Sequence, residues 1–384
     1  MKAVTCTNGA LDLVELPAPQ PEEGQIRLEV LRAGICGSDL HARHHADQLA
    51  EVGAASGYQD LMRSADTVVL GHEFSGAVGE YGPDTRRRWR RGTAIVAMPI
   101  RRRAGKPHLT GLSAQAPGAF AEQVVVEESL AFAVPNGLAP DRAALTEPMA
   151  VAEHAVNRAE ASRRDTAVVI GCGPIGSAVV AVLASRRVER IIAVDFSPTR
   201  RALALRMGAH IVIDPATDSA YAELEGRGFV TESPQLWQLA VDGMKALRRM
   251  PIPWEPLWHA ADRFGLVTPR APIVFECVGV PGIIDDVISR APLSTRIVVV
   301  GVCMEDDRFR PALAVNKEVD LRFSMGYTPI EFRDALHKLA DGDLDPSPLI
   351  TGTVGLDRVE QAFAMLGDGH EHAKILVDPQ RVEP

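Results

Sequence analysis

The sequence predicts an α/β protein in which a β-rich amino-terminal part precedes a doubly wound parallel sheet. Three observations carry this prediction. Up to residue 146, short Val- and Ile-rich runs alternate with Gly and Pro, which is typical of a domain built mainly from strands. From Ala150 onward, runs of consecutive apolar residues alternate with helical stretches, as in strands that are covered on both faces. A glycine-rich turn separates the first of these runs from the helix predicted after it.

The predicted strands of the first part are residues 26–31, 67–70, 93–97 and 123–126. Those of the parallel sheet are residues 167–170, 190–194, 210–213, 272–277 and 296–300. Helices near 329–339 and 356–366 and a last strand at 373–378 close the chain.

Composition places the chain among soluble globular proteins. It has 384 residues, a net charge of −9, 46% hydrophobic and 24% charged residues, which excludes a disordered, coiled-coil or collagen-like chain and suggests two or three domains. The acidic balance speaks against a nucleic-acid binder. The five cysteines are scattered and never form C-x-x-C, so we expect no disulfide framework and a reducing, cytoplasmic compartment. No signal peptide is visible at the amino terminus.

One stretch is long enough to be mistaken for a membrane span. Residues 166–185 form a run of 20 positions without a charged side chain. Three glycines and a proline in the middle favour a buried strand, a tight turn and a buried helix instead, so we expect no contact with membranes.

Two further stretches stand out. Residues 86–106 carry nine basic residues and no acidic one, which predicts solvated turns around a strand, or alternatively a surface for an anionic ligand or a partner subunit. Residues 217–262 contain three of the four tryptophans, and helices at 220–226 and 234–249 would fill this long connection. This insertion is either a structural excursion, a subunit contact or a cover over the active cleft.

The glycine-rich turn has the pattern G-x-G-x-x-G, which is a weak signal alone but stands here between a predicted strand and a predicted helix. It consists of Gly171, Cys172, Gly173, Pro174, Ile175 and Gly176. The first glycine allows the tight turn, the second lets the backbone approach a pyrophosphate, and the third allows close packing of helix on strand. The positive end of the helix dipole favours the phosphates. The motif therefore predicts a dinucleotide site.

The residue that selects the dinucleotide is predicted at the end of the next strand. Asp195 lies 19 residues beyond Gly176, where a carboxylate can accept hydrogen bonds from the adenosine ribose and repel a 2′-phosphate. This favours NAD over NADP. Arg200 and Arg201 are the counter-argument, because they could turn toward such a phosphate.

Candidate metal ligands lie in three separate segments. Cys36 stands in GICGSDLH, His72 and Glu73 in GHEFSG, and Glu147 in EPMAVAEHAV. Thiolate, imidazole and carboxylate suffice for a catalytic zinc with three protein ligands and an open position, although their spacing does not prove that they meet. Three further histidines, His41, His44 and His45, share one face if helical and form a weaker alternative metal site.

With these motifs and VIGCGPIG, FECVG and AKILV in the same order, the sequence resembles the zinc-containing medium-chain dehydrogenases/reductases, the alcohol and polyol dehydrogenase family. The resemblance covers nearly the whole chain. It implies a GroES-like catalytic domain at 1–149 and 306–384, and a Rossmann NAD-binding domain at 150–305 with an insertion at about 217–262. It also implies a homodimer or homotetramer and a small-molecule alcohol or ketone as substrate.

The resemblance also implies residue roles. Cys36, His72 and Glu147 become zinc ligands or near-ligands, and Glu73 can join or exchange with them. Asp39 would orient the His72 ring, Ser38 and His41 would carry the alcohol proton away, and Lys374 would place a cation near the pyrophosphate. Two alternatives have different chemistry: a zinc-free quinone or enone reductase, which would lack the Cys/His pair, and a non-enzymatic dinucleotide-binding protein.

One departure from the family affects its second metal. The family's structural zinc needs four closely spaced cysteines after GHE, but no cysteine lies between Phe74 and Glu147. We therefore expect one catalytic zinc per chain and no structural zinc. A zinc ion lowers the pKa of a bound water from about 15.7 to about 7, which is equivalent to roughly 12 kcal/mol. A general base accelerates a reaction by about 10²–10⁴-fold, which is equivalent to roughly 3–5 kcal/mol. The metal ligands should therefore matter more than the proton relay.

Overall fold

The computed structural model describes residues 1–264, 267, 269–367 and 372–381. Its contacts divide the chain into two compact units. Unit 1 contains Met1–His154, Gly173–Ser185 and Gly326–Pro384, and unit 2 contains Ala155–Cys172 and Arg186–Met325. Both ends of the chain therefore belong to unit 1, and each unit is described by itself below.

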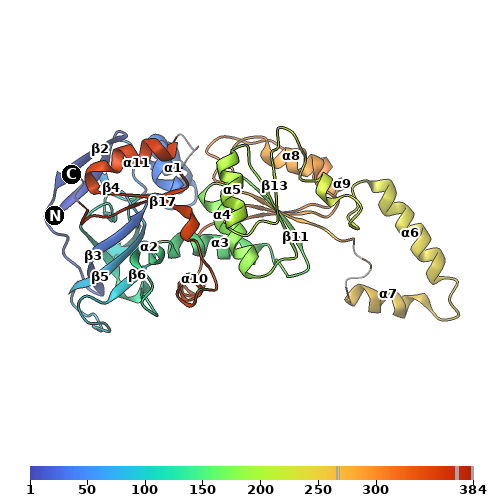
Figure 1. The fold of residues 1–384 in the computed structure, drawn as a ribbon, viewed down its shortest axis with the longest axis horizontal. Helices are drawn as coiled ribbons and strands as arrows, with labels where there is room; N and C mark the ends of the chain where they lie inside the picture. The colour runs from blue at the N-terminus through green and yellow to red at the C-terminus, as the bar shows by residue number, and fades with distance from the viewer. Residues whose placement is uncertain (265–266, 268, 368–371, 382–384) are drawn as a thin grey trace. The chain divides into compact units, whose positions relative to one another are not determined.

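Unit 1 is built on β-sheets (Figure 1). A three-stranded sheet has the order β2-β1-β4, with bounds Ala10–Glu15, Lys2–Thr7 and Val68–Val69. A seven-stranded sheet has the order β10-β6-β5-β3-β18-β17, with β9 also paired to β3. Its bounds are Ala131–Ala133, Ala94–Ala97, Glu73–Tyr81, Gln25–Gly34, Lys374–Val377, Ile350–Val354 and Gln123–Glu127. The hairpin β7–β8 spans Ile100–Arg103 and Lys106–Leu109, at the end of the arginine-rich stretch.

Unit 1 also contains helices. Its α-helices are α1 Gly37–Ala55, α2 Pro140–Ala143, α3 Thr146–Arg158, α4 Pro174–Ser185, α10 Pro329–Asp341 and α11 Val359–Gly367. The short 3₁₀ turns are η1 Glu128–Leu130, η3 Ser347–Leu349 and η4 Leu356–Arg358. The last turn of α3 is grouped with unit 2. Ile26, Leu28 and Phe74 of the sheet pack with Phe120 and Phe363 in one buried core, in which the two last rings meet edge to face.

Unit 2 contains a six-stranded parallel sheet in the order β13-β12-β11-β14-β15-β16. Its strands are Ile211–Ile213, Arg190–Val194, Thr166–Ile170, Ile273–Glu276, Arg296–Val299 and Asp320–Phe323. Its helices are α5 Pro198–Arg206, η2 Ala222–Leu224, α6 Ser233–Leu247, α7 Trp254–Arg263, α8 Ile283–Arg290 and α9 Pro311–Asn316. Val168, Ile192, Val274 and Ile297, one from each inner strand, are fully buried, as expected for a sheet covered on both faces. The predicted fold class is confirmed.

The apolar stretch at 166–185 forms β11, a turn and α4, as predicted. Within the residues that the structure describes, no helix is both long and apolar enough to cross a lipid bilayer.

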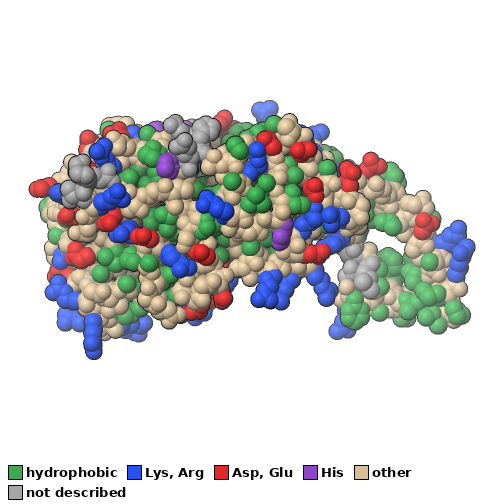
Figure 2. All heavy atoms as spheres, in the orientation of Figure 1, with side chains coloured by type: hydrophobic (Ala, Val, Ile, Leu, Met, Phe, Trp, Pro, Cys, Tyr) green, Lys and Arg blue, Asp and Glu red, His purple; other side chains and the backbone are tan. Residues whose placement is uncertain are grey.

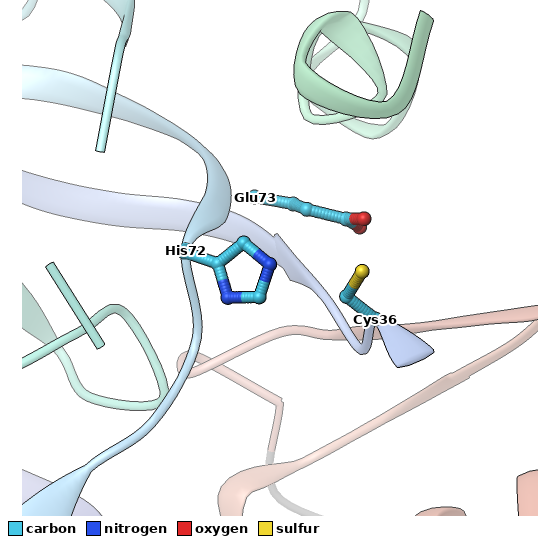
Figure 3. Close-up of side chains that lie close together, drawn as sticks. All are labelled: Cys36, His72 and Glu73. Carbon is cyan, nitrogen blue, oxygen red and sulfur yellow. The ribbon is translucent and has the colours of Figure 1, made fainter. Parts of the chain in front are cut away.

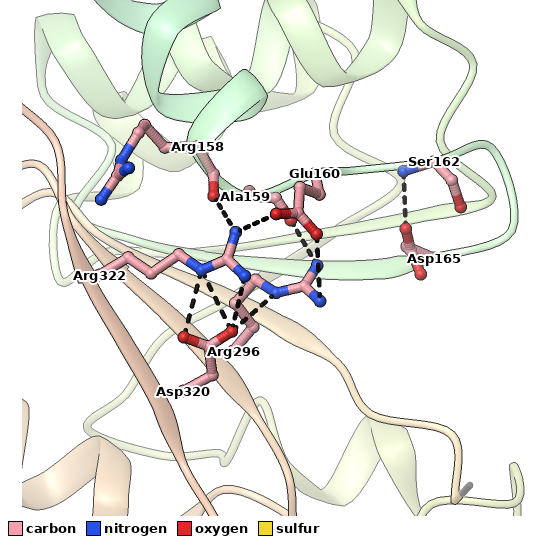
Figure 4. Close-up of polar contacts among 8 residues, drawn as sticks. All are labelled: Arg158, Ala159, Glu160, Ser162, Asp165, Arg296, Asp320 and Arg322. Atoms are coloured by element: carbon pink, nitrogen blue, oxygen red, sulfur yellow. Dashed lines mark hydrogen bonds and ion pairs between the residues drawn. The ribbon is translucent and has the colours of Figure 1, made fainter.

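The sequence analysis did not predict the edge strand β16. The structure groups residues up to Met325 with unit 2, whereas the predicted boundary was placed after residue 305. An ionic cluster ties the edge of the sheet to the turn after α3: Arg322 contacts both Asp320 and Glu160 at 2.8 Å, and Arg296 reaches Asp320 at 3.4 Å (Figure 4). The strand was missed because an edge strand with charged, half-buried residues lacks a continuous apolar run.

The insertion between β13 and β14 forms η2, α6 and α7. The first predicted helix is only a 3₁₀ turn, the second is confirmed within two residues, and α7 was not predicted. Among the described residues of α6 and α7 none is buried, and hydrophobic side chains gather on the surface there (Figure 2). Trp237 is 65% exposed, and Met244, Trp254 and Trp258 help to line a pocket of about 300 Å³. The role of this insertion stays a prediction.

Candidate metal centre and dinucleotide loop

Cys36 stands at the start of α1, where the chain leaves strand β3. Its own N–H donates a hydrogen bond to the carboxylate of Asp39, at 2.9 Å, which fixes the first turn of the helix. The Cys36 Sγ lies 3.9 Å from the Ser38 hydroxyl. Burial, followed by the negative charge of Glu73, raises the pKa of the Cys36 thiol. A divalent cation that binds the thiolate would offset both effects.

His72 is held by the same carboxylate. Asp39 is fully buried, and its Oδ1 lies 3.3 Å from Nδ1 of His72 and accepts a hydrogen bond from the N–H of Gly71, also at 3.3 Å. Burial alone would lower the pKa of His72, but the charge of Asp39 and hydrogen bonds to Asp39 and Cys36 raise it above its ordinary value. With Nδ1 beside Asp39, Nε2 is the ring nitrogen available to a metal. Asp39 thus lies beside the ring as expected, and its role in orienting the ring stays a prediction.

The backbone before His72 requires glycine. Gly71 has φ +96°, and a Cβ there would lie 2.7 Å from the ring of Phe120. A larger residue would therefore disturb the position of His72 as well as the core of unit 1.

Glu73 begins strand β5 and is fully buried. Its two carboxylate oxygens accept hydrogen bonds from Nζ of Lys374 at 2.8 and 2.7 Å. The residue opposite Glu73 on β3 is Gly34, and a Cβ on that glycine would clash with the Glu73 carboxylate. The missing side chain at Gly34 therefore makes room for the carboxylate at this point of the sheet.

Cys36, His72 and Glu73 each offer one ligand atom, and these atoms all lie within 4.8 Å of one another (Figure 3). In the close-up, the Cys36 sulfur and the Glu73 carboxylate face each other beside the His72 ring. Among the described residues this is the group of Cys, His and carboxylate side chains compact enough to hold a metal ion. Sulfur, nitrogen and oxygen donors in this combination fit zinc, and fewer than four protein ligands leave a position open.

Glu147 lies at the start of α3 and is not part of this compact group. The charges of Glu73, His72 and Lys374 act on it. Burial, and then repulsion from Glu73, raises the pKa of Glu147 to about 7. Its role as a zinc ligand stays a prediction.

Lys374 was expected beside the pyrophosphate of the dinucleotide. In the structure its ammonium is fully buried and donates to Glu73 and to the carbonyl oxygen of Ile35, at 3.1 Å. Burial alone would lower the pKa of Lys374, but the charges of Glu73 and Cys36 outweigh it and raise this pKa. The role at the pyrophosphate stays a prediction, whereas the contact with Glu73 was not foreseen.

The predicted proton relay starts beside the metal group. Ser38 contacts Cys36, and His41 lies one turn further along α1, partly buried, with its ring centroid 6.1 Å from that of His45. Burial, and secondarily the charge of His45, lowers the pKa of His41. Ser38 and His41 as proton carriers stay a prediction, and the exposed His44 takes no part in the compact metal group.

In unit 2, the start of the glycine-rich turn is anchored on Asp195. Gly171 follows β11 with φ +87°, and a Cβ there would lie 2.7 Å from Val278, so the turn requires glycine. Asp195, directly after β12, accepts hydrogen bonds from the N–H groups of Cys172 and Ser197, both at 2.8 Å. The carboxylate therefore ties the two loops together at the carboxyl ends of adjacent strands, where dinucleotides bind in such sheets.

Two arginines flank this carboxylate. Arg200 lies 4.0 Å from Asp195, while Arg201 pairs with Asp214 at 3.0 Å and donates to the Asp195 carbonyl oxygen. In unit 1, the rest of the motif begins α4: Pro174 is its first residue, and the Gly173 carbonyl accepts a hydrogen bond from the N–H of Ser177. Pro174, Ile175 and Gly176 thus form the first turn of a helix, as predicted.

Another feature of the metal site was missed by the sequence analysis: Gly34 makes room for Glu73. Gly34 stands in the quoted motif GICGSDLH, but the need for a missing side chain appears only when β3 and β5 are paired.

Comparisons with known proteins give the family. Residues 22–136 match the model of the alcohol dehydrogenase GroES-like domain. The chain is 30% identical over 371 residues to (R,R)-butanediol dehydrogenase of Bacillus subtilis (strain 168), covering 94% of each chain. It is 32% identical to erythritol/L-threitol dehydrogenase of Mycolicibacterium smegmatis, over 65% of this chain and 74% of that one. The crystal structure of 2R,3R-butanediol dehydrogenase from Bacillus subtilis superimposes with a TM-score of 0.76 at 28% identity, covering 99% of both chains. The chain therefore belongs to the zinc-type alcohol and polyol dehydrogenases of the medium-chain dehydrogenase/reductase family.

Proposed function

We propose that this chain is a zinc- and NAD-dependent dehydrogenase that interconverts a secondary alcohol and its ketone. The observation that carries the proposal is the compact group of Cys36, His72 and Glu73, with Asp39 bonded to the cysteine backbone and lying beside the histidine ring. A purely structural core would not need a thiol, an imidazole and a carboxylate within 4.8 Å of one another, because burying polar groups costs free energy unless they are paired.

We also propose that the substrate carries a second hydroxyl group next to the reacting one. Several of the similar proteins are named for butanediol, for erythritol and L-threitol, or for sorbitol. These compounds share a pair of hydroxyl groups on neighbouring carbons, one of them secondary. A vicinal diol or polyol is therefore the substrate class that we infer for this chain.

When bound, zinc makes the alcohol proton easier to remove, and NAD accepts the hydride. Cys36 and His72 would hold the metal, with Glu73 or Glu147 as the third ligand. Ser38 and His41 would carry the proton to solvent. Asp195 would accept hydrogen bonds from the adenosine ribose and repel a 2′-phosphate, and the start of α4 would face the pyrophosphate. Each of these roles, apart from those of zinc and NAD themselves, belongs to a side chain or a helix end that is described above.

We propose one zinc per chain. The donor set for it is the group described above, and no cysteine lies between residues 74 and 147, where the family's second zinc would need four. The hairpin β7–β8 lies in this part of the chain.

A panel of alcohols, with and without a second neighbouring hydroxyl, tests the function. We expect NADH formation to be fastest with vicinal diols or polyols and slower with NADP in place of NAD. Treatment with a chelator should abolish the activity, and added zinc should restore it. Activity that survives complete removal of metal would instead support a zinc-free reductase, and no turnover of any alcohol would support a non-enzymatic dinucleotide-binding protein.

The proton relay has its own test in Ser38→Ala. Removing this hydroxyl should lower kcat by about 10- to 100-fold, because a positioned proton acceptor contributes about 10²–10⁴-fold and water can replace part of it. The zinc content should stay as in the wild type, since Ser38 supplies none of the proposed ligands. Loss of zinc together with activity would show that Ser38 acts on the metal site and not on the proton.

A further inference from the structure

Helices α6 and α7 of unit 2 have apolar faces that nothing covers. The structure describes all 15 residues of α6 and all 10 of α7, and none of them is buried. On α6, Trp237, Leu239 and Val241 are 65%, 60% and 61% exposed. Isolated helices of this length are marginal in water, because most helical stability in proteins comes from packing an apolar face. The two helices therefore need a packing surface that the described part of the chain does not supply.

The apolar stripe of α6 is broader than one neighbouring helix requires. At about 100° per residue, it extends from Leu239 through Leu236, Met244 and Trp237 to Val241, which is about 200° of the helix circumference. Leu236 and Met244 are partly buried, and Met244 lines a pocket of about 300 Å³ together with residues of α7. The exposed rest of the stripe is typical of a helix in a bundle, which has a neighbour on two sides.

The exposed apolar surface is large enough for a stable protein contact. Beyond α6, Met250, Ile252 and Phe264 are 42%, 51% and 77% exposed. An aromatic side chain offers about 150–250 Å², so these residues and the three exposed ones of α6 together expose on the order of 600 Å². Hydrophobic side chains gather on this surface in Figure 2. A standard interface buries about 800 Å² on each partner, which the neighbouring polar residues would complete.

The charges beside this surface are of both signs and lie in separate places. Lys245, Arg248 and Arg249 stand at the end of α6 and directly after it, whereas Glu255 and Asp262 belong to α7. Within the residues that the structure describes, none of these five side chains forms an ion pair. Such a surface is complementary to a second copy of itself, because each basic end can face the acidic helix of the other copy.

We propose that α6 and α7 form an interface between two copies of this chain. The two helix pairs pack about a twofold axis, which covers the apolar stripe of α6 and brings the basic end of each α6 to the α7 of the other copy. A lipid surface fits less well, because membrane-bound helices carry a mainly basic polar face, and α7 has Glu255 and Asp262 beside Arg263. The inference goes beyond the proposed function and does not depend on it.

The molar mass of Leu239→Glu in solution, measured by light scattering at micromolar concentration, tests the apolar contact. We expect the wild type to have twice the mass of one chain or a multiple of that, and the variant to have half the wild-type mass. A charge in the apolar contact should raise the Kd of association by at least about 30-fold. Leu205→Glu is the matched control and should keep the wild-type mass, because Leu205 is also an exposed leucine on a helix of unit 2.

A charge exchange tests the pairing of α6 with the α7 of the other copy. Lys245→Glu/Arg248→Glu gives both helices acidic residues, and Glu255→Lys/Asp262→Lys gives both basic ones. Like charges then face each other in either variant alone, so each should have half the wild-type mass. An equimolar mixture should regain the wild-type mass, because both contacts of the mixed pair join opposite charges. This recovery also shows that the two variants are folded.

Four results would overturn the proposal. A wild-type protein with the mass of one chain would do so, and its sedimentation with vesicles that contain an anionic lipid would identify a membrane surface instead. An unchanged mass of Leu239→Glu would place the subunit contact elsewhere, and a raised KM in that case would identify a cover over the active cleft. A mass of Leu205→Glu that falls as far as that of Leu239→Glu would show that the effect is not specific to α6. A mixture that stays at half the wild-type mass would refute the pairing of α6 with α7.

Discussion

Cys36→Ala is expected to abolish both turnover and metal binding. The variant removes the sulfur donor and leaves an imidazole and carboxylates as the remaining candidates. Because zinc lowers the pKa of a bound hydroxyl by an amount equivalent to roughly 12 kcal/mol, its loss should lower kcat by at least about 10⁴-fold. Turnover of the preferred alcohol and elemental analysis of the purified variant measure the two effects.

Binding of NAD is the internal control for this variant. Asp195 and the glycine-rich turn use contacts in which Cys36 takes no part, so titration with NADH should give a Kd close to that of the wild type. Cys303→Ala is the matched control for Cys36→Ala. Cys303 is also a free, partly exposed cysteine, but it lies in unit 2 and takes no part in the metal group. Wild-type turnover in Cys36→Ala would refute the zinc mechanism.

Lys374→Met is expected to destabilise the protein more than a surface substitution would. Lys374 and Glu73 are 1% and 0% exposed and lie 2.7 Å apart. Removing the ammonium leaves the Glu73 carboxylate buried without its cation, and breaking one partner of such a pair costs about 3–5 kcal/mol. The free energy of unfolding in urea, measured on metal-free protein, reports this change.

The double variant Lys374→Met/Glu73→Gln distinguishes the loss of a charge partner from a packing defect. Without the carboxylate no charge is left alone, so the double variant should be more stable than Lys374→Met. A single variant within about 1 kcal/mol of the wild type would show that Glu73 does not depend on Lys374. Equal stability of the single and double variants would point to packing of the lysine stem instead.

The buried parts of the fold were the most predictable from sequence. Strands β11, β12, β14 and β15 lie within one residue of their predicted bounds, because strands covered on both faces are apolar without interruption. The edge strand β16 has no such run and was missed. Helix α7 was missed because prolines at 251, 253 and 256 read as breaks, although proline is tolerated before and within a first helical turn.

The candidate site was predictable in its residue types but not in its contacts. Cys36, His72 and Glu73 could be named from their motifs, whereas their convergence depends on pairing β3 with β5 and on the start of α1. The contact between Lys374 and Glu73 joins residues 301 positions apart. Its existence depends on the antiparallel pairing of β18 with β3, which no local pattern encodes.

X-ray absorption at the zinc edge of the purified wild-type protein tests the central claim most directly. Cys36 is the one cysteine of the proposed donor set, so the account predicts one sulfur neighbour at about 2.3 Å, with nitrogen and oxygen neighbours at about 2.0–2.2 Å. Elemental analysis of the same sample should give one zinc per chain. A zinc shell without sulfur, or one with several sulfur neighbours, would contradict the site formed by Cys36, His72 and a carboxylate.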